Sequence, residues 1–215
     1  MVKKDKAYAV SPSGRAAVAA GLGRTDWKKP AVTTQEYSGS FFGNALHSVV
    51  PPELCPGVWA GAIQRFLAEH AFETNVLLMT RFPSAREDEE ADVLAELIPH
   101  IRRVVSESGL ELHLASDRQL VDDIHGNVAA HMWACRFGIG LFEDRLGRGL
   151  NYNVLSEVGA MLMTGRRCAL LKDRTAPSMP SDIGGKIYKP VDFANRHAVA
   201  AVVSSWCKDD LGLSV

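Results

Sequence analysis

The sequence predicts a three-layer α/β protein in which helices cover both faces of a parallel β-sheet. Short apolar runs at 75–80, 137–142 and 167–171 have the length of buried strands. Helical patterns separate these runs along the chain, which is the order of βαβ units. The chain has 215 residues, 47% of them hydrophobic, which is enough to bury one core of this kind.

Residues 1–72 read differently and are predicted to be an N-terminal extension. Its first part comprises a short helix at 11–22 and an irregular arm at 23–48 rich in Gly, Ser, Thr and Lys. Pro51-Pro52 then opens a predicted helix at 51–70. Its apolar face comprises Leu54, Val58, Ala62, Phe66 and Leu67. We expect this helix to pack on the domain or to make an oligomer contact.

The α/β domain is predicted over residues 73–215 and begins with the strand at 75–80. A helix is expected at 87–108, with acids at its start and a kink at Pro99. The alternating run at 110–114 predicts an outer strand with one wetter face. The remaining elements are a mostly helical connection at 117–135, a strand at 137–142, a helix at 153–164, a strand at 167–171, a short strand at 186–189 and a closing helix at 196–209.

Composition excludes several classes of protein. The formal net charge of -1 and the pI of about 6.7 provide no basic field for nucleic acid. No run approaches the roughly 18 apolar residues of a membrane span, and no apolar segment follows the charged start as a secretory signal requires. The four cysteines form no CxxC pair and are predicted to be free, buried thiols. These observations favour a cytoplasmic protein that binds neither nucleic acid nor membrane.

Glu157 is the leading candidate for a functional residue. It is predicted to lie in the first turns of the helix at 153–164, which Asn153 is placed to cap. This helix follows a strand, so it begins at the carboxyl edge of the sheet, where open parallel sheets bind ligands. A single acid there can act as a nucleophile or transfer a proton. The alternative is a surface acid that compensates the helix dipole.

A resemblance supports the first interpretation. The run NYNVLSEVG at 151–159, followed by RCALL at 167–171, is similar to the NPNVxxELG…KPVILL segment of TIR-like nucleotide-binding domains. It also looks like the GTxxEIG segment of nucleoside 2-deoxyribosyltransferases. Further matches in the same order are 75–82, 137–144 and 178–188. The resemblance covers about 75–211 and implies a flavodoxin-like sheet of strand order 2-1-3-4-5.

The resemblance implies that Glu157 works at a glycosidic carbon. The expected activity is hydrolysis of an N-glycosidic bond in a nucleotide, with NAD⁺ as the leading substrate, no separate cofactor and a role in bacterial defence. A nucleoside monophosphate N-glycosidase or a deoxyribosyltransferase is the first alternative, and a non-catalytic nucleotide sensor is the second. The families also suggest a homo-oligomer. Tyr152 stands where they commonly have Pro, and the loop after the first strand begins Thr80-Arg81 rather than with small residues.

Four further residues are expected to contact the nucleotide directly. Arg81 suits a phosphate and Phe82 suits stacking on a base, although either side chain can instead pin the loop. Asn151 and Asn153 are expected to orient the sugar.

Asp144 ends the strand at 137–142 and can hold a ribose hydroxyl. The alternative is a turn acid that precedes Gly147 and Gly149. Asp123 and Asn127 share a helix face at i, i+4 and are also expected to face the substrate.

Other polar residues carry weaker signals. Arg145 and Arg148 can meet a phosphate or be solvated in their loop. His125 and His131 lie near acids, but their spacing matches no standard zinc motif, so no metal site is predicted.

Overall fold

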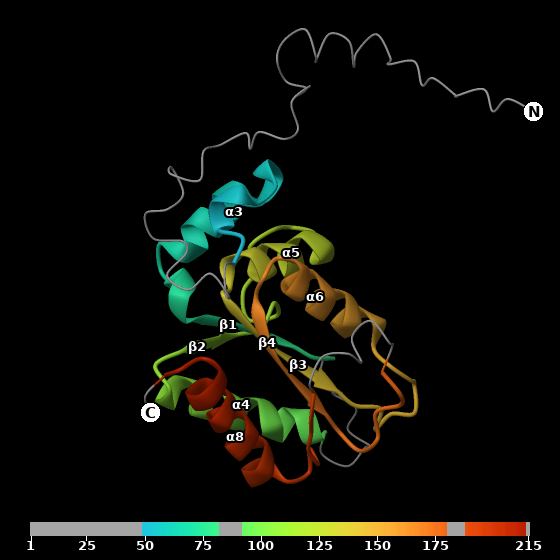
Figure 1. Cartoon of the computed structure of the whole chain (residues 1–215). Coiled ribbons are helices and arrows are strands. Elements are labelled where there is room, and N and C mark those ends of the chain that lie inside the picture. The colour runs from blue at the N-terminus through green and yellow to red at the C-terminus, as the bar shows by residue number, and fades with distance from the viewer. Residues whose placement is uncertain (1–48, 82–91, 180–187, 214–215) are drawn as a thin grey trace, which may run out of the picture. The chain divides into compact units, whose positions relative to one another are not determined.

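The computed structural model describes residues 49–81, 92–179 and 188–213 and shows a five-stranded parallel sheet of order β2-β1-β3-β4-β5 (Figure 1). The strands are β1 Asn75–Met79, β2 Glu111–His113, β3 Phe137–Phe142, β4 Arg167–Lys172 and β5 Lys189–Pro190. The predicted flavodoxin-like α/β arrangement and its strand order are confirmed. The predicted helix at 11–22 and the arm at 23–48 lie outside the described residues.

Helices cover both faces of the sheet. They are α3 Gly57–Leu67, α4 Val93–Glu107, α5 Ile124–Ala134, α6 Tyr152–Met163 and α8 Arg196–Ser205. Single turns precede or follow them at η2 Pro52–Leu54, η3 Phe72–Thr74 and η4 Trp206–Asp210. In Figure 1, α4 and α8 lie side by side on one face, whereas α5 and α6 lie on the other. The outer strand β2 is shorter than predicted, and β5 begins at the last residue of its predicted range.

Strand β3 forms the centre of the core and controls how closely α6 approaches. Ile139 and Leu141 are buried with the side chains of α4 and α8. The two glycines face the other way, because a Cβ at Gly140 would lie 2.8 Å from Val158 Cγ2 and one at Gly138 would lie 3.1 Å from Met161 Cε. The close neighbours of these glycines therefore include helix α6, which is held against β3 through Val158 and Met161.

Helix α4 confirms the helix predicted at 87–108, and within the described residues it begins at Val93. Asp92 caps it by accepting a hydrogen bond from the Leu94 backbone N–H at 3.0 Å. Pro99 lies inside the helix, as predicted. The buried stripe comprises Leu94, Leu97, Ile101, Val104 and Val105.

The predicted helix at 51–70 is wrong in its extent, and its predicted apolar face is confirmed only in part. Pro56 confines Cys55 to an extended backbone, so η2 ends there and α3 begins at Gly57. Leu54 and Val58 are 57% and 83% exposed, whereas Ala62 and Phe66 are buried as predicted. The buried face is Ala62, Ile63 and Phe66, and it packs against Ala130 and Ala134 of α5. Helix α3 thus packs on the α/β layers, and an oligomer contact stays a prediction.

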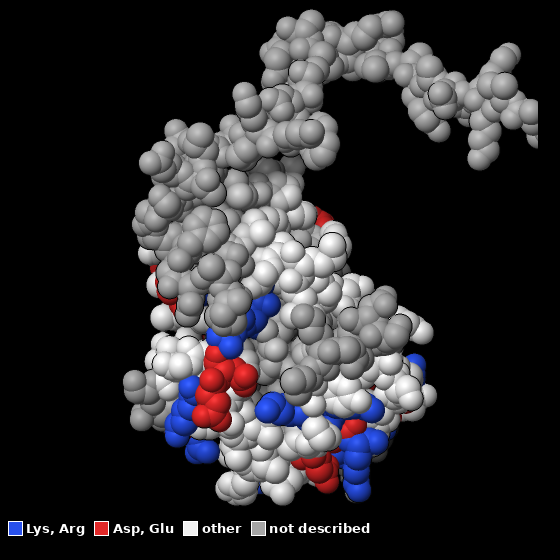
Figure 2. Space-filling model, viewed as in Figure 1, with Lys and Arg blue, Asp and Glu red and all other residues white. Residues whose placement is uncertain are grey.

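The remaining properties agree with the composition. All four cysteines are free thiols, and Cys135 and Cys207 are buried. No helix among the described residues combines the length and the apolar character needed to cross a membrane. Figure 2 shows basic and acidic side chains interspersed on the visible face, with no field of a single sign.

Candidate active site

A cavity of about 570 Å³ opens at the carboxyl edge of β1, β2 and β3, beside the start of α6. This is the position at which open α/β sheets bind ligands, and the volume suits a small molecule. Much of the wall is aliphatic, including Leu77, Leu114 and Ile124. The polar lining residues are Thr80, Arg81, Ser116, Glu143, Asp144, Arg148, Asn151, Asn153 and Glu157. The cavity therefore combines an apolar wall with convergent polar groups.

Glu157 lies in the second turn of α6 and lines this cavity, as predicted. It is half-buried because it immediately precedes Val158, which is fully packed against β3. Burial raises the pKa of the Glu157 carboxyl to about 7. Among the described residues, the carboxyl makes no hydrogen bond or ion pair. It is thus an acid that changes protonation state near neutral pH and is accessible to a ligand.

The cap of α6 corrects one prediction. The N-cap residue is Asn151, whose Oδ1 accepts hydrogen bonds from the backbone N–H groups of Asn153 at 3.0 Å and Val154 at 3.4 Å. Asn153 lies one residue inside the helix and does not cap it. The helix begins earlier than expected because Tyr152 already adopts the helical backbone. Both asparagines line the cavity, and their contact with a sugar stays a prediction.

Arg81 lines the cavity, but its guanidinium is already bound to acids. It pairs with Asp92 at the start of α4 and with Glu143 at the end of β3. The Asp92 contact is bidentate, with Arg81 Nη2 donating to Oδ1 at 2.9 Å. A phosphate would have to displace one of these carboxylates, so the structure favours the alternative that Arg81 pins the loop. Phe82 lies outside the described residues.

Asp144 performs the turn role that was the alternative interpretation. Its Oδ1 accepts hydrogen bonds from the backbone N–H groups of Arg148 at 2.6 Å and Gly149 at 2.8 Å. Gly147 and Gly149 have φ values of 63° and 80°, a backbone region that favours glycine. Asp144 also lines the cavity, and its contact with a ribose hydroxyl stays a prediction.

Asp123 and Asn127 are not brought to the cavity. Asp123 caps α5 by accepting from Gly126 N–H at 2.6 Å. The Asn127 side chain accepts from Leu120 N–H at 2.6 Å and donates to the Ala115 carbonyl at 2.7 Å. Their polar atoms hold the loop between β2 and α5, so the geometry does not support the predicted substrate contacts.

The arginines and histidines that the sequence singled out lie in different parts of the structure. Arg148 lines the cavity, whereas Arg145 pairs with Asp173 at 2.8 Å and Asp192 at 2.9 Å. His131 is buried, with its Nδ1 2.8 Å from the Asn127 carbonyl, and His125 is exposed.

Glu143 and Thr80 are among the polar cavity-lining residues that were missed from the sequence. Glu143 is only 8% exposed, pairs with Arg81 and accepts a hydrogen bond from Arg145 N–H at 2.8 Å. Thr80 Oγ1 is buried and has no hydrogen-bond partner within the described part of the chain. Both residues come directly after a strand, and that position is the signal that indicates them.

The fold and the cavity define a class of protein: a flavodoxin-like α/β protein with a ligand-sized cavity at the carboxyl edge of its sheet and an acid of raised pKa in the cavity wall. Comparisons of the chain with protein-family models, with curated proteins and with solved structures found no match.

Proposed function

We propose that this protein hydrolyses an N-glycosidic bond of a nucleotide, with Glu157 as the catalytic carboxylate and NAD⁺ as the leading substrate. The observation that carries the proposal is Glu157 itself. Its carboxyl is half-buried, is unpaired among the described residues and faces a cavity of suitable size. The order of strand, cap and acid around it supports the same chemistry.

The proposed reaction breaks the bond between the sugar carbon and the base nitrogen. The bonding electrons leave with the base, and positive charge develops on the sugar carbon. An ionised Glu157 stabilises or traps this centre, and water then supplies the hydroxyl group and releases a proton. Nicotinamide needs no proton to leave, because its ring nitrogen is cationic in NAD⁺ and becomes neutral when the bond breaks.

The charges in the cavity wall favour a substrate whose reacting end is cationic or neutral. Three acids line the cavity, namely Glu143, Asp144 and Glu157. Of the two basic lining residues, Arg81 is already paired with Asp92 and Glu143. Arg148 therefore remains, among the described lining residues, as the side chain best placed to meet a phosphate. A cationic nicotinamide ring is compatible with this excess of acids.

The decisive experiment is incubation of the purified full chain with NAD⁺ and, in parallel, with nucleoside monophosphates. Products are separated by chromatography. We expect nicotinamide from NAD⁺, and a loss of about 10²–10⁴ in kcat for Glu157→Gln. Undiminished turnover by that variant would remove Glu157 from the mechanism. Binding of NAD⁺ without any turnover, measured by calorimetry, would instead favour a nucleotide sensor.

The pH profile distinguishes the two substrate classes. Cleavage of NAD⁺ needs the ionised carboxylate, so kcat/KM should rise with pH and level off above the pKa of about 7. Cleavage of a nucleoside monophosphate needs a proton for its neutral base, so kcat/KM should fall above the same pKa. Initial rates measured from pH 5 to 9 on both substrates test this. A profile that is flat across about pH 7 would contradict a role for the titration of Glu157.

A further inference from the structure

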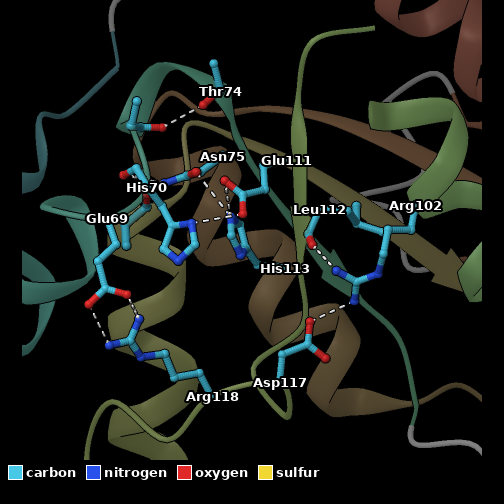
Figure 3. Close-up of polar contacts among 12 residues, drawn as sticks. Glu69, His70, Thr74, Asn75, Arg102, Glu111, Leu112, His113, Asp117 and Arg118 are labelled. Atoms are coloured by element: carbon cyan, nitrogen blue, oxygen red, sulfur yellow. Dashed lines mark hydrogen bonds and ion pairs between the residues drawn. The ribbon is translucent and has the colours of Figure 1, made fainter. Parts of the chain in front are cut away.

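Three potential metal ligands converge beside the outer strand β2, away from the cavity. Glu111 and His113 are two residues apart on β2, so their side chains share one side of the sheet. His70 approaches them from the segment between α3 and β1 (Figure 3). One ligand atom from each of the three residues lies within 4.8 Å of the others. None of the three lines the cavity.

The distances are near those of a coordination shell. His70 Nδ1 lies 2.9 Å from Glu111 Oε1, and His113 Nε2 lies 3.9 Å from Glu111 Oε2. Neighbouring ligands on tetrahedral zinc are about 3.3 Å apart, since each lies about 2.0–2.1 Å from the ion. Small side-chain rotations would therefore bring the three atoms onto one ion.

The surroundings hold both imidazole rings in place. The Phe66 ring centroid lies 4.6 Å from that of His70 and 5.0 Å from that of His113. The two imidazole centroids are 4.9 Å apart. Side-chain exposure is 9% for His113, 24% for His70 and 48% for Glu111. The cluster is thus ordered on its inner side and open to solvent on its outer side, which leaves a path for an ion.

Asn75 determines which nitrogen of the His113 ring carries the proton, and therefore which tautomer is present before an ion binds. Its Nδ2 donates to the carbonyls of His70 and Ala134, at 3.2 and 3.1 Å, so its Oδ1 is an acceptor. His113 Nε2 lies 3.1 Å from that oxygen and therefore carries the proton of the neutral ring. To bind an ion through Nε2, the His113 ring must adopt the other neutral tautomer, which carries the proton on Nδ1. This change of tautomer involves no net loss of a proton from His113.

We propose that His70, Glu111 and His113 bind one divalent ion of the zinc type, with water in the fourth position. Two imidazoles and one carboxylate suit Zn²⁺ and Co²⁺ better than Mg²⁺ or Ca²⁺, which prefer oxygen ligands. The single carboxylate would leave the occupied site with a net charge of +1. The ion would join the α3–β1 connection to the edge strand β2. The sequence alone does not indicate this site because His70 is far from the other two ligands along the chain.

Titration of the chelator-treated full chain with Zn²⁺ tests the site, with calorimetry as the readout. Visible absorption of bound Co²⁺ reports its coordination independently. We expect one ion per chain, and at least about tenfold weaker Zn²⁺ binding in Glu111→Gln and in His70→Gln, because even loss of an outer-shell partner typically costs that much. The matched control is His125→Gln, which removes an exposed histidine of α5 and should leave the affinity unchanged.

Two outcomes would overturn the proposal. One is no uptake of Zn²⁺ by the unmodified chain, in which case Glu111 is simply an ion-pair partner of His70. The other is a Zn²⁺ affinity in Glu111→Gln and His70→Gln that equals that of the unmodified chain, which would place the bound ion at other residues. Glu111 and His70 are partly exposed, so both variants should fold, and circular dichroism of each verifies this.

Discussion

The half-buried carboxyl of Glu157 carries a cost in stability above neutral pH. The only cause of its raised pKa is burial, and no described cation compensates for it. A carboxyl whose pKa is higher in the folded than in the unfolded chain binds its proton more tightly when folded. The favourable contribution of this carboxyl to the free energy of unfolding is therefore complete below its ordinary pKa of 4.5. It is lost as the pH rises through about 7.

Replacement of Glu157 by Gln should therefore stabilise the protein at alkaline pH. We expect the free energy of unfolding to increase by about 1–3 kcal/mol at pH 8, because a charge no longer has to be buried. At pH 4 the effect should be small, since the native carboxyl is then neutral. Urea denaturation of both proteins at the two pH values measures the difference. An equal effect at both pH values would show that the titration of Glu157 is not its cause.

At the scale of the element, β3 and α6 act as one unit that places the acid. Gly140 leaves the space that Val158 fills, and Val158 is the neighbour of Glu157 in the chain. Asn151 fixes where the helix begins. The position of the carboxyl thus depends on the contact that the next residue makes with β3 as well as on its own surroundings.

Gly140→Ala should disturb this unit. The added methyl group would lie 2.8 Å from Val158 Cγ2, so the Val158 side chain or α6 must shift. We expect a loss of about 1–3 kcal/mol in the free energy of unfolding and a lower kcat. Thermal unfolding and NAD⁺ turnover measure the two effects.

Gly159→Ala is the matched control within α6. A Cβ there meets no atom within 4 Å, so this change should stabilise the helix by up to about 1 kcal/mol and leave kcat unaltered. Equal effects of the two substitutions would show that the contact between β3 and α6 does not determine the placement of Glu157.

At the scale of the whole molecule, the sequence predicts the sheet better than it predicts the site. The bounds of β3 agree with the prediction and those of β1 differ by one residue, because continuous apolar runs of about four to eight residues favour buried strands over helices. The predicted helix at 51–70 was wrong in its extent because Pro56 interrupts it, and of its predicted apolar face Leu54 and Val58 are exposed. The prediction that Glu157 lies near the start of a helix at the carboxyl edge of the sheet agrees with the structure, because this position follows from the order of strand and helix along the chain.

The partners of polar side chains were harder to predict. Arg81 looks like a phosphate ligand in the sequence, but Asp92 and Glu143 reach it from other elements. Asp123 and Asn127 look exposed to a ligand, but they hold a loop instead. Such pairings depend on tertiary contacts that no local sequence pattern records. The position of Glu157 could therefore be predicted, whereas the partners of the polar side chains around it could not.

The two glycines of β3 have a consequence for recognising relatives of this protein across evolution. A Cβ at either position would force neighbouring side chains to shift, namely Val158 at Gly140 and the ends of Met79, Cys168 and Met161 at Gly138, so we expect descendants that keep α6 this close to favour glycine at both. Drift elsewhere in the chain can erase overall similarity while these positions remain fixed. A glycine pair in the third strand, followed by an asparagine and then an acid six residues later, is therefore the pattern by which distant kin should be recognised.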